Sequence, residues 1–135
     1  MSTFHLKIST PDGLKFDGEV ERLRVRMIDG DVSLLARHAD YVSAVGAGEA
    51  AILTADGQTR CAACIGGMVS VVDGAVTLVP TTFEWAEDID VDWAKRSAQD
   101  AIRRKENSKE QQELVFAEMK LKRAMNRLRV SSMKE

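Results

Sequence analysis

Two cysteines, Cys61 and Cys64, form a C-x-x-C motif whose spacing could serve metal or redox chemistry. A structural zinc ion needs four ligands, and neither His5 nor His38 lies at the spacing that a zinc finger requires. If residues 58–64 form a strand, the odd separation places the two sulfur atoms on opposite faces of the sheet. A redox motif would follow a strand and open a helix, and no helix pattern follows here. We therefore interpret the pair as small, half-buried residues in a reducing compartment and predict no metal site.

The sequence also lacks the patterns of a nucleotide-hydrolysing or nucleophilic site. It contains no Gly-x-x-x-x-Gly-Lys-Ser/Thr phosphate loop, and Gly46-Ala47-Gly48 opens no helix pattern. No combination of serine, histidine and acidic residues suggests a catalytic triad. We therefore predict that the chain is not an enzyme and binds no cofactor.

Charge and hydropathy exclude two further classes of protein. The formal net charge is −2 with charged residues at 30%, whereas a nucleic-acid binder would carry a basic excess. No window approaches the roughly 18 consecutive apolar residues of a membrane span, and the N-terminus lacks the basic and apolar regions of a signal peptide. These features predict a soluble cytoplasmic protein that binds no nucleic acid and meets a membrane only through its partners.

The spacing of apolar residues changes at an acidic joint, residues 83–90. Before the joint they alternate with polar residues, as at Phe4, Leu6 and Ile8, and after it they recur every third or fourth position. Asp-Gly pairs favour tight hairpin turns, and five interrupt the first 82 residues: Asp12-Gly13, Asp17-Gly18, Asp29-Gly30, Asp56-Gly57 and Asp73-Gly74. The chain is therefore predicted to be α+β, with an N-terminal antiparallel β-sandwich or flattened barrel of short strands followed by helices.

Two helices are predicted after the joint. Asp90 is a suitable N-cap for the first, and Ser108 with Gln111 matches a capping box that opens the second. One face of the first helix carries a stripe of mostly small residues, Ala94, Ala98, Ala101 and Ile102. The second, from about residue 109 to 129, carries a seam of Leu114, Ala117, Leu121, Ala124 and Leu128. The stripe and the seam should pack against each other, which makes the pair a helical hairpin.

The second helix is acidic at its start and basic towards its end. Glu110 and Glu113 lie near its first turn, and its later turns carry Lys120, Lys122, Arg123, Arg127 and Arg129. This asymmetry suits the helix dipole, so the cations can simply form a solvated face. Phe116, Met119 and Met125 lie off the seam, however, and a basic helix with spare apolar residues also suits an acidic partner surface.

Several motifs, taken in order, resemble the epsilon subunit of bacterial F-type ATP synthases. The matching segments are Phe4-x-Leu6-x-Ile8-x-Thr10-Pro11-Asp12-Gly13, Gly18-Glu19-Val20-Glu21-x-Leu23, Asp29-Gly30-Asp31, His38, Gly66-Gly67, Val76-Thr77-Leu78, Ile89-Asp90 and Leu121-Lys122-Arg123-Ala124-Met125-Asn126-Arg127-Leu128. The resemblance covers nearly the whole chain. It implies a sandwich of about ten short strands, residues 1–84, that binds the gamma subunit and the membrane c-ring, and a regulatory helical hairpin, residues 88–135.

The resemblance implies a non-catalytic rotor subunit of the central stalk. Such a subunit couples ion flow through the c-ring to ATP synthesis in the catalytic head, and lies at the cytoplasmic side of the cell membrane as a peripheral component. Its c-ring-facing loop corresponds to residues 30–41, where Asp31 and His38 fit the family pattern. Ala36-Arg37 replaces the usual Pro-Gly of that loop and alters its turn chemistry.

The resemblance also assigns roles to the hairpin. In the family it can extend into the catalytic head, where basic residues approach an acidic segment of a beta subunit and hinder ATP hydrolysis. The residues that match are Lys120, Lys122, Arg123, Arg127 and Arg129. Such a hairpin is a two-state element, and a ligand that prefers one state shifts the balance.

Some family members bind ATP through a motif at the start of the first helix. This chain keeps Ile89 and Asp90, has Trp93 and Asp100 where arginines are expected, and retains Arg103. Because aspartate repels phosphate, we predict weak or absent ATP binding. The alternative hypothesis is a stand-alone β-sandwich adaptor that dimerises through its hairpin.

Overall fold

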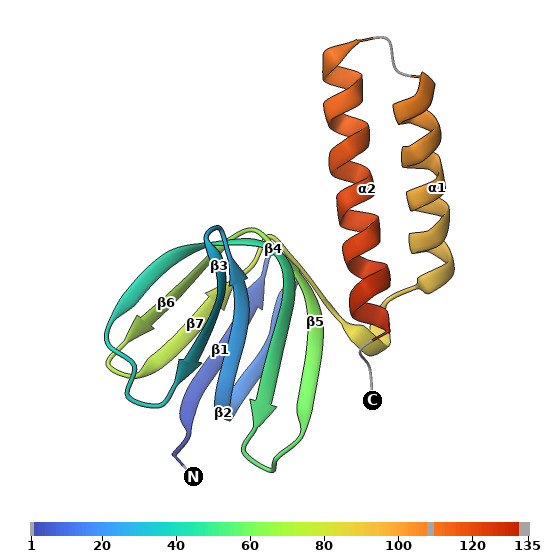
Figure 1. Ribbon diagram of the computed structural model, residues 1–135. Coiled ribbons are helices and arrows are strands. Elements are labelled where there is room, and N and C mark those ends of the chain that lie inside the picture. Colours follow the sequence, from blue (N-terminus) through green and yellow to red (C-terminus); the bar gives the residue numbers. More distant parts are fainter. Residues whose placement is uncertain (1, 108–109, 133–135) are drawn as a thin grey trace.

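A computed structural model describes residues 2–107 and 110–132 of the chain. Within these residues, eight strands precede a short 3₁₀ turn and two helices (Figure 1). The strands are β1 (Phe4–Thr10), β2 (Gly13–Met27), β3 (Gly30–Leu35), β4 (Tyr41–Thr54), β5 (Thr59–Ile65), β6 (Met68–Val72), β7 (Ala75–Val79) and β8 (Thr82–Trp85). The turn η1 (Ala86–Asp88) leads to α1 (Val91–Asn107) and α2 (Gln111–Ser131).

The strands form a sandwich because two of them are long enough to serve both layers. The strand order is β3-β2-β1-β7-β6-β4-β5-β8, and β2 also pairs with β4. Strands β2 and β4 contain 15 and 14 residues, and the register between them shifts at two points, which marks where the strands bend. All pairings in the sheet are antiparallel except the one between β1 and β7.

Long strands also explain why the described residues form eight strands and not about ten. The turn predicted at Asp17-Gly18 is wrong, because both residues lie inside β2 and pair with Lys7 and Leu6 of β1. The other Asp-Gly pairs do lie at turns between antiparallel strands, as predicted: Asp12-Gly13, Asp29-Gly30, Asp56-Gly57 and Asp73-Gly74.

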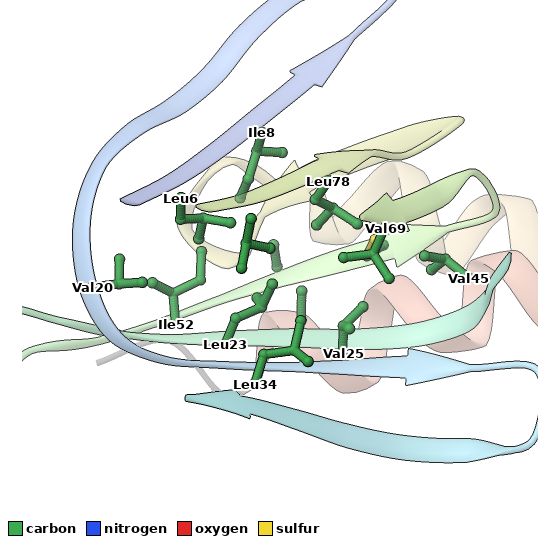
Figure 2. Close-up of a cluster of buried hydrophobic side chains, with 14 of the residues drawn as sticks. Leu6, Ile8, Val20, Leu23, Val25, Leu34, Val45, Ile52, Val69 and Leu78 are labelled. Carbon is green, nitrogen blue, oxygen red and sulfur yellow. The ribbon is translucent and has the colours of Figure 1, made fainter. Parts of the chain in front are cut away.

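The core of the sandwich is formed by the inward-facing residues of both layers (Figure 2). Leu6 and Ile8 of β1, Leu23 of β2, Ile52 of β4 and Leu78 of β7 are fully buried. The predicted alternation is therefore confirmed. Every buried member of this cluster lies between residues 4 and 85, so the sandwich has a core to which the helices contribute nothing.

The helices pack against each other through the predicted stripe and seam. Ala94, Ala98 and Ala101 of α1 are buried, whereas Ile102 is 43% exposed and does not belong to the stripe. All residues of the α2 seam are buried or half-buried: Leu114, Ala117, Leu121, Ala124 and Leu128. Small residues on α1 let the two helices approach closely.

Helix ends differ in how well the sequence predicted them. The backbone N–H of Trp93 donates to Oδ1 of Asp90 at 2.9 Å, so Asp90 is a cap as predicted. Ser108 lies outside the described residues. Helix α2 begins at Gln111, with Glu110 as its N-cap and no side-chain cap hydrogen bond.

We expect Gly67→Ala to be one of the most destabilising small substitutions in the sandwich. Gly67 has φ +90°, and a Cβ there would lie 2.0 Å from the carbonyl oxygen of Val79. Strain and overlap together should lower the free energy of unfolding by roughly 3 kcal/mol or more. Gly57→Ala is the control, because Gly57 has φ +87° but no atom lies within 4 Å of its Cβ position. Denaturant unfolding of both variants checks this; equal losses would contradict it.

Candidate functional site

The hairpin is attached to the sandwich at its base. Figure 1 shows the C-terminal end of α2 beside η1 and β5, while the C-terminal end of α1 and the start of α2 lie far from the strands. The apolar part of this attachment is a small cluster on the outer face of the sheet. It joins Cys61 and Ala63 of β5, Ala86 and Ile89 of the joint, and Val130 of α2. This cluster is separate from the sandwich core.

The two cysteines lie on opposite faces of β5, as the sequence predicted. Cys64 belongs to the core of the sandwich, and Cys61 packs beneath the hairpin. Neither forms a disulfide, and burial raises the pKa of Cys64 to about 12, which keeps it protonated and unreactive. Among the residues that the structure describes, no group of three or more His, Cys, Asp or Glu side chains could hold a metal ion.

Two polar contacts join α2 to the sandwich beside the apolar cluster. The buried Asn126 donates from Nδ2 to the carbonyl oxygen of Gly48 on β4 at 3.1 Å. Arg127 donates from Nε to Glu84 on β8, and its guanidinium also lies 5.0 Å from the centre of the Trp93 ring on α1. Arg127 therefore contacts all three parts of the attachment: the sheet, α1 and its own helix.

A second group of charges holds the two helices together. The Asp100 carboxylate on α1 pairs with Lys120 on α2, with Arg103 at 2.6 Å and with Arg104 at 3.2 Å. Hydrogen bonds to Asp100, the stronger effect coming from Lys120 and the next from Arg103, hold its pKa below the ordinary value. Asp100 is thus bound to cations on both helices.

The five cations predicted to form one basic face do not share one environment. Lys120 and Arg127 are part of the ion pairs just described and are less than one-third exposed. Lys122 and Arg129 line a groove between α2 and the sheet. Arg123 is exposed, and the structure records no ion pair for it within the described residues. Sequence spacing gave no signal for this division, because it depends on which elements lie beside α2.

The positions of the degenerate ATP motif have structural roles. Ile89 is buried beneath the hairpin, and Asp90 caps α1. Trp93 lies against Arg127, and Arg103 is paired with Asp100. Arg103, the one cation among these five positions, is therefore paired with another motif position, Asp100.

Asp31 and His38 do not lie in one continuous loop, so the loop expected over residues 30–41 is wrong for residues 30–35, whereas the c-ring-facing role of the two residues stays a prediction. Asp31 lies near the start of β3 and faces Arg26 at 3.7 Å, whereas His38 follows the end of that strand. The His38 ring packs edge-on against Tyr41, with 5.7 Å between ring centres. Residues 30–35 pair with β2, and this pairing overrides the loop character of the segment.

Comparison with known proteins decides the family. A model described as the β-sandwich domain of the ATP synthase Delta/Epsilon chain matches residues 3–86, and one described as the long α-helix domain of the same chain matches residues 87–132. The chain belongs to the ATP synthase delta/epsilon chain family. As the motifs predicted, this makes it an epsilon-type central-stalk subunit that is not itself catalytic.

The similarity of this ATP synthase chain to individual relatives extends over its whole length. The ATP synthase epsilon chain of Ruminococcus albus is 36% identical over 135 residues, which cover 99% of this chain and 100% of that one. The epsilon chain of an Exiguobacterium species is 34% identical, with both chains covered completely. A chain of the Euglena gracilis mitochondrial ATP synthase (OSCP/F1/c-ring) matches at a TM-score of 0.84 over 99% of this chain and 83% of that one. At 18% identity, this match shows the shared fold alone.

No helix among the described residues of this epsilon-type chain is both long and apolar enough to span a bilayer.

Asp100 should make the stability of the hairpin depend on pH. The folded-state pKa of Asp100 lies below its ordinary value of 3.8, so its ion pairs are fully formed above that value and are lost as the pH falls through the folded-state pKa. We expect Asp100→Asn to destabilise the hairpin at neutral pH and to flatten its acid dependence. Far-UV circular dichroism melts across the acid range measure this. Glu106→Gln on the same helix is the control, and equal acid profiles for the two variants would contradict the role of Asp100.

Proposed function

We propose that the sandwich, residues 1–84, carries the contacts with the gamma subunit and the c-ring, and that the hairpin, residues 88–135, regulates ATP hydrolysis. The observation that supports this division best is the small attachment at the base of the hairpin. A separate sandwich core allows the hairpin to leave without unfolding the strands. The chain would then rotate with gamma and the ring, and help couple ion flow to ATP synthesis.

An uncharged sheet face supports the contact with gamma. Strands β6 and β7 and the first half of β4, residues 41–47, contain no charged residue. Their outer face exposes large apolar side chains, with Val42 at 64%, Val72 at 56% and Met68 and Val79 at 47%. A contiguous exposed apolar surface of this kind is typical of a protein interface. We assign gamma to this face.

The edge strand β3 supports the contact with the c-ring. Asp31 lies near the start of this strand and His38 follows its end, and among the described residues the strand pairs with β2 alone. A ring contact that includes both residues would run along the sheet edge for about 20 Å, the length of a six-residue strand. The subunit would thereby be a peripheral component at the cytoplasmic side of the cell membrane, attached through the complex.

The cations of α2 support an inhibitory role in the catalytic head. Arg123 is exposed and paired with no acid in the described structure, so it can meet an acidic segment of a beta subunit directly. Lys120 and Arg127 would exchange Asp100 and Glu84 for carboxylates of the partner. Such an exchange replaces one ion pair by another, which keeps the two arrangements close in free energy.

Weak or absent ATP binding remains part of the proposal. Trp93 and Asp100 occupy positions where a phosphate would need cations, and Arg103 is already paired. The dimerising adaptor is not favoured, because α1 covers the seam through which it would self-associate.

Val42→Asp should weaken binding of the isolated chain to gamma at least tenfold, because a charge would enter the centre of an apolar interface. Val42 is 64% exposed, so the fold should tolerate the change. Leu14→Asp is the matched control, since Leu14 is 56% exposed but lies on β2. Titration calorimetry with gamma measures both; unchanged affinity of Val42→Asp would place gamma elsewhere.

Truncation after Asp88 should raise ATP hydrolysis by the complete complex roughly two- to tenfold, with assembly intact, because the cations of α2 are removed from the head. Arg123→Glu should produce part of that rise. Lys95→Glu is the control, as Lys95 is an exposed cation on α1. Hydrolysis that is equal in the full and truncated complexes would show that the hairpin is not inhibitory under those conditions.

A further inference from the structure

A groove of about 870 Å³ lies between the last turns of α2 and the outer face of β2 and β4. It is distinct from the contact between Arg127 and Glu84, whose residues do not line it. β4 bulges beside β2 at this point: Val25 pairs with Ala50 but Met27 pairs with Val45, so the intervening β4 residues have no ladder partner on β2. One wall of the groove is sheet and the other is helix.

The groove is basic although the chain as a whole carries a net charge of −2. Its lining includes four cations and two carboxylates: Arg24, Arg26, Lys122, Arg129, Asp31 and Glu49. Arg24 and Glu49 neutralise each other at 2.6 Å, and Arg26 and Asp31 are separated by 3.7 Å. Lys122 and Arg129 face no carboxylate within ion-pair distance among the described residues. The uncompensated charge of the groove therefore comes from α2.

Local packing holds two of these cations in place. Asn126 donates to Gly48 and accepts from Nη2 of Arg129 at 2.8 Å, so one buried amide ties Arg129 to the sheet. The side-chain stem of Arg26 lies against Gly48, where an added Cβ would come within 2.7 Å of it. Both arginines are thereby positioned before any ligand binds, which lowers the entropy lost on binding.

Apolar side chains lie among the charges. Ile28 and Met125 line the groove and are 71% and 52% exposed. Lys122 and Arg129 are seven residues apart, which is about 10 Å along a helix. An extended segment spans about 13 Å in four residues, and side chains four positions apart point the same way. The lining thus suits carboxylates four positions apart, which the long side chains of Lys122 and Arg129 can reach, with apolar residues between them.

We propose that this groove binds a short acidic, partly apolar segment of a partner protein in extended conformation. The segment would place its carboxylates on Lys122 and Arg129 and its apolar residues on Met125 and Ile28. Because one wall belongs to α2 and the other to the sheet, the segment binds only while the hairpin lies against the sandwich. Binding therefore stabilises that arrangement. This consequence adds to the proposed regulation, whereas the binding itself does not depend on it.

The test uses the full chain and a short synthetic peptide in which two glutamates flank three leucines. Fluorescence anisotropy should show binding that is lost when glutamine replaces glutamate in the peptide. Lys122→Glu combined with Arg129→Glu should weaken it at least tenfold, and the milder pair Lys122→Gln and Arg129→Gln severalfold. Lys95→Glu combined with Arg96→Glu is the control, because it changes the chain's charge equally on exposed residues of α1.

Methyl resonances locate the peptide. The signals of Ile28 on the sheet and Met125 on α2 should shift together in one titration. Equal loss of affinity in the groove and control variants would overturn the proposal, as it would indicate non-specific charge attraction. Resonance shifts confined to one wall of the groove would also overturn the proposal. A third contrary result would be that inorganic triphosphate binds in the groove and the glutamate peptide does not, which would assign the groove to a phosphate ligand. Since gamma and ATP hydrolysis play no part in the assay, its result is independent of the proposed function.

Discussion

The arrangement of this chain depends on the contact of Val130 and Ile89 with the outer face of β5. Only small residues, Cys61, Ala63 and Ala86, complete that contact, so its apolar area is modest. Nevertheless it places Arg127 beside Glu84 and Asn126 beside Gly48, and it sets the width of the basic groove. Without this contact, the ion pair, the amide hydrogen bond and the groove would all be lost together.

The charges around this contact tune its strength and do not create it. Ion pairs at the protein surface contribute about 0–1 kcal/mol each, because solvent and salt screen them. Arg127 is mostly buried and also lies against Trp93, so its contact with Glu84 lies at the upper end of that range. A hairpin whose base is attached by one apolar cluster and a few polar contacts can detach from the sheet and bind it again without disturbing the sandwich core. This is the property that a regulatory arm requires.

Local patterns in the sequence predicted local structure well. Alternation identified the buried residues of β1 and β2, and the alanine stripe identified the packed face of α1. The failures came where distant segments decide the outcome. Pairing with β1 keeps Asp17-Gly18 inside β2 despite its turn preference, and pairing with β2 turns the start of an expected loop into β3. The cations of α2 lie in different environments for the same reason, because Asp100 and Glu84, which pair with two of them, come from elsewhere in the chain.

The parallel pairing of β1 with β7 has a consequence for synthesis on the ribosome. Leu6 and Ile8 pair with Val76 and Leu78, so the first strand cannot complete its hydrogen bonds until more than half of the 135 residues have been made. Contacts of such long sequence separation slow folding. The edge of β1 that β7 covers in the folded chain therefore stays unpaired while β1 and β2 are already able to form a hairpin, and an unpaired edge is a place where other strands can add. The helices are made last, and their binding site on β5 is already complete when α2 leaves the exit tunnel.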